Sequence, residues 1–344
     1  MKPLFRNNFL VFGIAALAVM IYCFPDGWQV VQQNRKGVLV YLPAILAVWA
    51  VVYACYSWAF QILVNSSDHD KHLSFRHSVK LTLSAFAFTG LTPLGFGGGP
   101  YRVMEMSKYI GMPHSISSVA LYSMMHILSH FVLWAIGCVV FIVFHYSIMT
   151  PIIWSFLLAY LVIFFGVAAF FHYSYKNGIL AKLFHIFFYI PGLSKVSRRF
   201  YERNITAFEK TDANFRFLYE HPRELWGSLV IEVVGRLLTS FEFLFILLAF
   251  GIPGANFIDS LIILCFSSLV GNILYILPMQ IGAREGSLAL ILPLLFPVAS
   301  AGIGVYTSIF TRIREIFWVM IGVALVKVGN KKIMKEAPQK SDKV

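Results

Sequence analysis

The chain has 344 residues, of which 58% are hydrophobic and only 13% are charged, and its mean hydropathy is +0.74. A soluble globular protein carries about twice that fraction of charge, so the composition excludes this class and indicates an integral membrane protein. The net charge of +12 comes mostly from Lys and Arg in polar gaps between apolar runs, which is typical of contact with anionic lipid. No basic, aromatic-interleaved soluble module is present, and we expect no nucleic-acid partner.

Apolar runs recur from residue 9 to residue 326, with no gap that could hold a separate globular core. We therefore predict a single membrane domain, 1–326, and a basic cytoplasmic tail, 327–344. Within the domain we distinguish an N-terminal half, 1–176, an amphipathic connector, 177–224, and a C-terminal half, 225–326. The cysteines have neither metal nor redox spacing, and we expect packing residues and no cofactor or metal; they are Cys23, Cys55, Cys138 and Cys265.

The first apolar run, Phe9–Phe24, follows Lys2 and Arg6 and is either a secretory signal or a first membrane helix. It has no suitable cleavage site after it, which favours a retained helix. Val38–Val64 is long enough to cross the membrane with some tilt.

The next polar segment, Asn65–Lys80, contains three histidines and two aspartates that suggest a metal site. Their spacing fits no standard metal site, so a solvated segment is favoured. These residues are Asp68, His69, Asp70, His72 and His77.

A glycine-rich break, Thr89–Glu105, separates two apolar stretches. Pro93 and Pro100 cannot continue a helix, and irregular backbone at membrane depth survives only where protein or a watery cavity shields it. Such a break favours a substrate site. The helix is expected to restart at about Tyr101 and to place Arg102 and Glu105 on one face. Because this limb ends near Gly111, it is too short to span, and a re-entrant hairpin is predicted.

The long run Ile116–Tyr146 contains His126 and His130, one helical turn apart. The pair could bind a metal, relay protons or pack as polar residues between helices, and the absence of a third ligand favours packing. A further apolar run, Pro151–Tyr175, follows.

The connector between Lys176 and Glu224 has nine Lys or Arg against five Asp or Glu. Its alternation of aromatic and charged residues suits either a helix in the headgroup layer or a small soluble hairpin. By the positive-inside rule the connector and the tail face the cytoplasm, and both termini are predicted to be cytoplasmic.

A second break, Leu277–Gly286, repeats the order proline, glycine, arginine and glutamate. Two ordinary surface loops are the alternative, but paired breaks in corresponding halves favour a substrate site at a repeat interface. The predicted fold is an all-α polytopic membrane protein with about six to eight transmembrane helices and two re-entrant or broken-helix hairpins as an inverted repeat. The number of transmembrane helices stays open because Phe257–Ile276 could span the membrane by itself. The other apolar runs of the C-terminal half are Leu225–Phe250, Ser287–Val298 and Gly302–Val326.

Several charged residues lie within or beside these apolar runs. A charge at the bilayer centre costs at least about 2.5 kcal/mol, so such residues must be paired, line water or sit near a surface. We expect structural pairing along one helix for Glu232 with Arg236, and for Arg312 with Glu315. Glu242, Arg284, Glu285 and Arg314 complete the set.

An arginine fork can hold a phosphate or a carboxylate through two hydrogen bonds, and helix N-termini at the breaks add positive potential. We therefore expect an anionic lipid headgroup as ligand, and no catalytic residues. The predicted substrate-binding residues are Arg102, Glu105, Arg284, Glu285, Arg312 and the glycines Gly97, Gly98 and Gly99.

The segments Pro93–Arg102 and Pro278–Glu285 resemble the two signature loops of the lysylphosphatidylglycerol synthase transmembrane family, also called flippase-like domain proteins. The resemblance covers roughly Phe9–Val326 and implies movement of aminoacylated or otherwise modified lipid, with Arg102, Arg284 and Glu285 lining a headgroup cavity. Bifunctional members of the family carry a C-terminal aminoacyl-transfer domain. Since the chain ends about 18 residues after its last apolar run, we expect that domain to be lacking.

The leading hypothesis is a non-enzymatic lipid translocator of a bacterial-type inner membrane. It would bind an anionic or aminoacylated phospholipid, or a polyprenyl-linked headgroup, in a central polar cavity. One alternative is a lipid-modifying enzyme with Glu105 or Glu285 as base. Another is a membrane subunit or scaffold for a partner synthase or glycosyltransferase.

Overall fold

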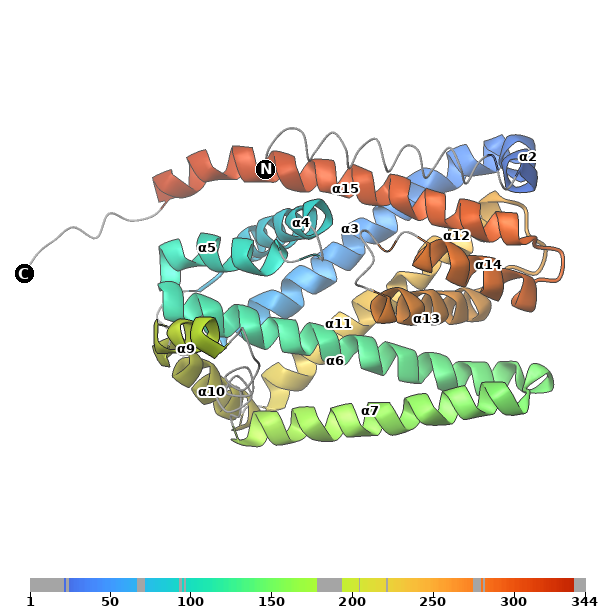
Figure 1. Cartoon of the computed structure of the whole chain (residues 1–344). Coiled ribbons are helices and arrows are strands. Elements are labelled where there is room, and N and C mark those ends of the chain that lie inside the picture. The colour runs from blue at the N-terminus through green and yellow to red at the C-terminus, as the bar shows by residue number, and fades with distance from the viewer. Residues whose placement is uncertain are drawn as a thin grey trace, which may run out of the picture. The chain divides into compact units, whose positions relative to one another are not determined.

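A computed structural model describes residues 22, 25–66, 72–92, 95, 97–177, 194–203, 205–220, 222–274, 280 and 282–336 (Figure 1). Within these ranges every regular element is a helix, which confirms the predicted all-α membrane class. Several predictions lie outside the described residues. They concern the first helix Phe9–Phe24, the residues Asp68, His69 and Asp70, the proline Pro93 and most of Leu277–Ile281.

Three described helices are long and apolar enough to cross a membrane, and they make this an integral membrane protein. They are α3 (Arg35–Asn65), α6 (Met112–Phe144) and α7 (Pro151–Asn177), within which Pro151–Tyr173 is the apolar part. Each agrees with a predicted run to within a few residues. A 31-residue helix such as α3 is about 46 Å long, against about 30 Å of hydrocarbon. Few residues of α7 are buried by other protein, as expected for a helix facing lipid.

The chain divides into two compact units. Unit one contains the described residues up to Ala50 and Leu237–Phe317, and unit two contains Val51–Arg236 and the chain from Trp318 onward. Among the described helices α3, α15 (Ala301–Glu336) and the end of α11 (Pro222–Leu238) therefore contribute residues to both units. The two units are described separately below.

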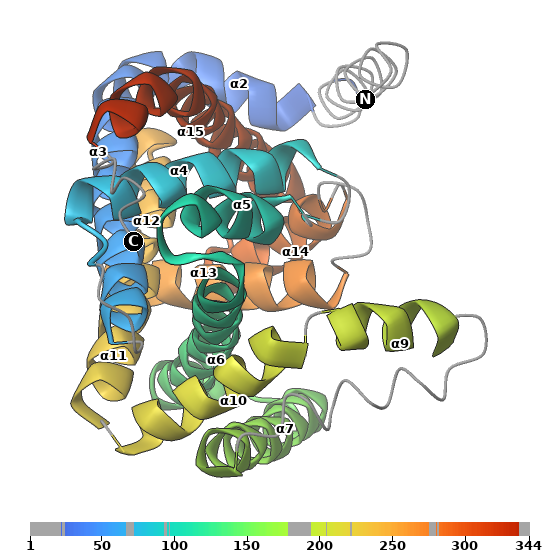
Figure 2. The same ribbon diagram turned by 90° about the vertical axis from the view of Figure 1, so that its left-hand side faces the viewer.

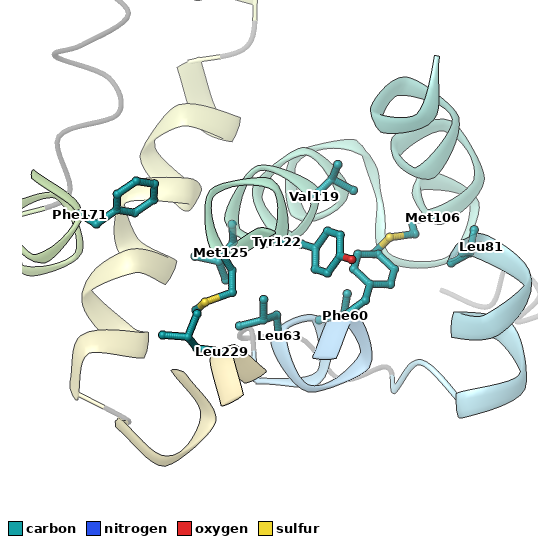
Figure 3. Packing of buried hydrophobic residues seen from close by; sticks show 11 residues of the cluster. Phe60, Leu63, Leu81, Met106, Val119, Tyr122, Met125, Phe171 and Leu229 are labelled. Atoms are coloured by element: carbon teal, nitrogen blue, oxygen red, sulfur yellow. The ribbon is translucent and has the colours of Figure 1, made fainter. Parts of the chain in front are cut away.

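Unit two is built around α6. This helix packs against α5 (Gly98–Ile110), α7 and α10 (Ile205–Glu220), and α10 contacts both α6 and α7 (Figure 2). The apolar core joins Phe60 and Leu63 of α3 to Tyr122 and Met125 of α6 (Figure 3). The remaining elements of the unit are α4 (Phe75–Leu91), the 3-10 turn η2 (Tyr146–Ile148), α9 (Ser194–Arg203) and α11 (Pro222–Leu238).

The first break is the tip of a hairpin in which α4 and α5 pack on each other. The Thr92 hydroxyl donates to the Phe88 carbonyl at 2.7 Å and accepts from the Gly97 amide at 2.8 Å, so local groups satisfy backbone that has left the helix. Gly95 has a φ of +67°, a conformation that favours glycine. The helix restarts at Gly98, three residues before the predicted Tyr101.

Unit one contains α2 (Pro25–Gln33), α12 (Ser240–Ala249), α13 (Phe257–Ile273) and α14 (Ala283–Leu295), together with parts of α3 and α15. The predicted run Leu225–Phe250 is divided at Thr239, where α11 ends and α12 begins. α13 has 17 residues, about 26 Å of helix, which is short of the hydrocarbon thickness. It packs on α14, so the second break also joins two helices of a hairpin. Re-entry of either hairpin and the total number of spans stay predictions.

The glycines of the first break give a test of this hairpin. A Cβ at Gly98 would lie 2.2 Å from the Thr89 hydroxyl and 2.8 Å from the Ala85 carbonyl oxygen, whereas a Cβ at Gly99 would meet no atom within 4 Å. We expect Gly98→Ala to destabilise the protein by about 1–3 kcal/mol through overpacking of α4 against α5. Gly99→Ala is the matched control and should leave stability unchanged or slightly raised. Thermal unfolding of the purified protein measures both, and equal melting temperatures would contradict the close approach.

Candidate functional site

The most distinctive residue of unit two is Arg102, on the second turn of α5. Its guanidinium carbon lies 4.8 Å from the ring centre of Phe60 and 4.5 Å from that of Tyr122. These two rings meet edge to face at 5.0 Å (Figure 3). The Arg102 Nε is buried and has no hydrogen-bond partner, and no carboxylate of the described residues lies within ion-pair distance of this arginine. Cation–π contact holds the charge while the N–H edge stays free.

Glu105, three residues further along α5, is buried and pairs with lysines. Its carboxylate lies 3.9 Å from Lys80 Nζ and 2.6 Å from Lys108 Nζ. Glu105, which was expected on the same helical face as Arg102, thus forms its ion pairs with two lysines. Around this carboxylate the lysines are in excess, so the surroundings of Arg102 carry a net positive charge. Lys80 was missed from the sequence because it ends a polar segment, yet α4 carries it into the protein interior.

A second polar cluster of unit two joins α6 to α11. Glu232 and Arg236 form the pair expected along one helix, at 3.6 Å. Glu232 Oε1 also accepts a hydrogen bond from His126 Nδ1, and Arg236 donates to His130 Nδ1 at 3.1 Å. Ser129 Oγ accepts from Arg236 Nε at 2.6 Å. The histidines thus act in polar packing between helices, as the sequence favoured, and no metal-binding group of three or more such ligands occurs among the described residues.

In unit one, Glu285 joins the second break to α15. Its Oε2 accepts from the backbone amide of Gly282 at 2.8 Å, which caps the start of α14 at a glycine with a φ of +86°. Its Oε1 accepts from Ser308 Oγ at 2.8 Å and from the Nε and Nη2 of Arg312 at 3.0 and 2.8 Å. One buried carboxylate therefore stabilises a helix terminus and an interhelical contact together.

The other charges of unit one also pair across helices. Arg284 Nη1 lies 2.6 Å from Glu315 Oε1 and 3.2 Å from Thr311 Oγ1. Arg314 binds the carboxylate of Glu242 with two hydrogen bonds, at 2.9 and 3.0 Å. Arg312 thus bonds to Glu285 and Glu315 bonds to Arg284, both across helices, while the pairing of Arg312 with Glu315 along α15 stays a prediction. Since α14 lies against α15, its acidic and basic residues at 284 and 285 reach the partners of opposite sign.

Indole contacts complete the Glu242 cluster. Trp49 Nε1 donates to Glu242 Oε2 at 2.8 Å, and the Arg314 guanidinium carbon lies 3.7 Å from the Trp49 ring centre. The sequence places Trp49 in a uniformly apolar run, so periodicity gives no signal for this contact. The one sequence signal for this cluster is that Glu242 and Arg314 are charged residues within apolar runs, and such residues require partners.

Among the predicted glycines, Gly97 and Gly98 lie against α4, while Gly99 faces open space. The first two are therefore explained by helix packing. The site residues fall into different units: Arg102, Glu105 and the three glycines belong to unit two, and Arg284, Glu285 and Arg312 belong to unit one.

The carboxylate of Glu285 allows a stability test. Glu285→Ala removes the cap of α14 and leaves the largely buried Arg312 without this acceptor, so we expect a loss of about 3 kcal/mol or more. Adding Arg312→Met should restore part of that loss, because it removes a largely buried charge that has lost its bonds to Glu285. Glu209→Ala, at an exposed position on α10, is the control. Unfolding by sodium dodecyl sulfate in mixed micelles measures all three, and a Glu285→Ala protein as stable as the control would refute this assignment.

Comparisons with known proteins bear on the identity of the chain. No curated protein and no solved structure matches it significantly. Residues 10–322 match the family model described as Lysylphosphatidylglycerol synthase TM region. This range contains both breaks and every candidate site residue. The chain therefore belongs to the family of the lysylphosphatidylglycerol synthase transmembrane region, which indicates a membrane-associated role related to lipid.

Proposed function

We propose that the protein is a lipid translocator that holds an anionic headgroup at Arg102. The observation that carries this proposal is a partly buried guanidinium held by Phe60 and Tyr122, with no carboxylate partner in the described part of the chain. A charge in the membrane interior costs at least about 2.5 kcal/mol even on the most lenient scale. An anion that binds the free N–H edge offsets that cost.

The contrast with the four described arginines that lie within or beside the apolar runs of the C-terminal half supports this choice. Each of them has a glutamate oxygen nearby, at distances between 2.6 and 3.6 Å; they are Arg236, Arg284, Arg312 and Arg314. A headgroup can reach Arg284 or Arg312 only by displacing a carboxylate. Arg284, Arg312 and Glu285 stay candidate ligands within unit one. Binding there requires the headgroup to replace a glutamate carboxylate, which costs free energy. Arg102 can bind a headgroup without displacing a carboxylate.

The chemistry of the site favours a phosphate or carboxylate ligand. A guanidinium fork binds such oxyanions through two parallel hydrogen bonds, which a single ammonium cannot do. The lysines that pair with Glu105, Lys80 on α4 and Lys108 on α5, add positive potential. The proposed ligand is an anionic or aminoacylated phospholipid or a polyprenyl-linked headgroup, supplied by a separate lipid-modifying enzyme as partner.

We place the protein in a bacterial-type inner membrane with both termini in the cytoplasm, on the basis of the basic connector and tail. Protease accessibility of a C-terminal tag in right-side-out and inverted vesicles tests this orientation. A tag cleaved in right-side-out vesicles would overturn it.

The function is tested by the lipids that accompany the purified protein. We expect mass spectrometry to find one anionic or amine-modified lipid enriched with the wild type and at least about tenfold less enriched with Arg102→Ala, because loss of one charged bidentate contact costs 1.4 kcal/mol or more. Arg102→Lys keeps the charge but loses the fork, and it should show an intermediate enrichment. The enriched lipid is then used in a proteoliposome translocation assay with the same variants.

Arg199→Ala, at an exposed position on α9, is the matched control and should behave as wild type. Equal enrichment with wild type and Arg102→Ala would remove Arg102 from the site. A wild type that carries only bulk lipid in membrane proportions would contradict a translocator and favour the scaffold of a lipid-modifying enzyme.

A further inference from the structure

We propose that headgroup binding at Arg102 is coupled to the uptake of one proton by the His126–Glu232 pair. This inference rests on the proposed function and names its coupling ion. It uses a histidine and a glutamate that the headgroup site itself does not need.

The hydrogen bonding of His126 leaves one ring nitrogen available. Because a carboxylate can only accept, the bond from His126 to Glu232 places the ring hydrogen on Nδ1. In the neutral ring Nε2 is then a bare acceptor, and it makes no hydrogen bond to the residues that the structure describes. The His126 side chain is 36% exposed, whereas that of Glu232 is fully buried. In this proposal the proton binds at Nε2, and the carboxylate on the opposite side of the ring stabilises the resulting imidazolium.

The neighbouring His130 cannot perform this step without losing a bond. Its Nδ1 accepts from Arg236, so this nitrogen must be unprotonated. An imidazolium carries hydrogen on both nitrogens and would face the guanidinium with a like charge. Arg236 is in turn fixed by Ser129 and by the backbone carbonyl of His126, which accepts at 2.9 Å. The available proton site is thus His126.

Tyr122 links this site to the headgroup arginine. Its ring centre lies 4.5 Å from the Arg102 guanidinium carbon and 5.7 Å from the His126 ring, so no more than about 10 Å separates the two cations. Charges at this distance interact measurably in a partly buried site. An anion bound to Arg102 offsets the repulsion between this arginine and an imidazolium at His126. Headgroup binding therefore favours protonation, and protonation favours headgroup binding.

The titratable and charged groups around His126 come from four helices, and the charges among them allow the uptake of one proton when a headgroup binds. Without ligand, Arg102 and Arg236 oppose the single carboxylate of Glu232, whose Oε2 has no hydrogen-bond partner. A headgroup phosphate adds one negative charge, and the proton on Nε2 adds one positive charge. Release of the headgroup returns the proton to water. The titratable and charged groups facing the pair are Cys55 and Tyr56 of α3, Arg102 of α5, Tyr122 and His130 of α6, and Arg236 of α11.

Calorimetry measures this coupling directly. The purified full chain is titrated with short-chain phosphatidylglycerol at about pH 7 in two buffers that differ in ionisation enthalpy, and the difference in heat gives the number of protons taken up. We expect an uptake approaching one proton per headgroup bound. The affinity should also rise as the pH falls from about 7.5 to about 5.5, by up to about tenfold per pH unit.

The variant His126→Gln keeps a donor for Glu232 but cannot titrate. We expect it to bind phosphatidylglycerol with no proton uptake and with an affinity that does not change over this pH range. His72→Gln, at an exposed position before α4, is the matched control and should take up the proton as wild type does.

The outcomes separate the two proposals. Wild-type binding without proton uptake, or undiminished uptake by His126→Gln, overturns the coupling and leaves the translocator standing. Absence of phosphatidylglycerol binding by the wild type overturns the coupling together with the headgroup site. Because the wild-type titration alone decides the first question, the test does not depend on the folding of a variant.

Discussion

The cost of an unpaired charge in a low-dielectric interior organises the polar chemistry of this protein. Arg314 in unit one satisfies the constraint with a bidentate glutamate and an indole face, and Arg284 and Arg312 satisfy it with one glutamate each. In unit two Arg236 meets it with a glutamate, a serine and a histidine. Among the described residues Arg102 has the rings of Phe60 and Tyr122 and no carboxylate partner. The distribution of counter-charges thus distinguishes Arg102, the proposed ligand site, from the arginines that bond to glutamates.

The two breaks solve the problem of irregular backbone by different local means. At the first break the hydroxyl of Thr92 bridges the end of α4 and the start of α5. At the second break the carboxylate of Glu285 caps α14 and also binds α15. Each of these side chains satisfies a backbone amide where a helix begins, at Gly97 or at Gly282. The similar sequences of the two breaks therefore support similar hairpins through different chemistry.

Much of the fold follows from the sequence, because long apolar runs bounded by prolines admit few alternatives. The bounds of α3, α6 and α7 were predicted closely, and so was the Glu232–Arg236 pair, since both depend on local spacing. The bond of Arg312 to Glu285 was missed, because the two residues are 27 positions apart and only tertiary packing brings them together. The aromatic neighbours of Arg102 were missed for the same reason: Phe60 and Tyr122 lie in apolar runs whose composition does not reveal which side chains meet.

The way in which Arg102 is held also bears on the speed of ligand exchange. An arginine locked to a carboxylate must first open that ion pair before it can engage a new anion, and this opening adds to the activation barrier on each binding event. A guanidinium resting on the faces of two rings has no such bond to break. Its ligand can arrive and depart without a preceding rearrangement of protein charges, so residence time depends on the headgroup itself. For the proposed translocator, which would have to release its lipid in every cycle, fast dissociation matters more than the highest affinity.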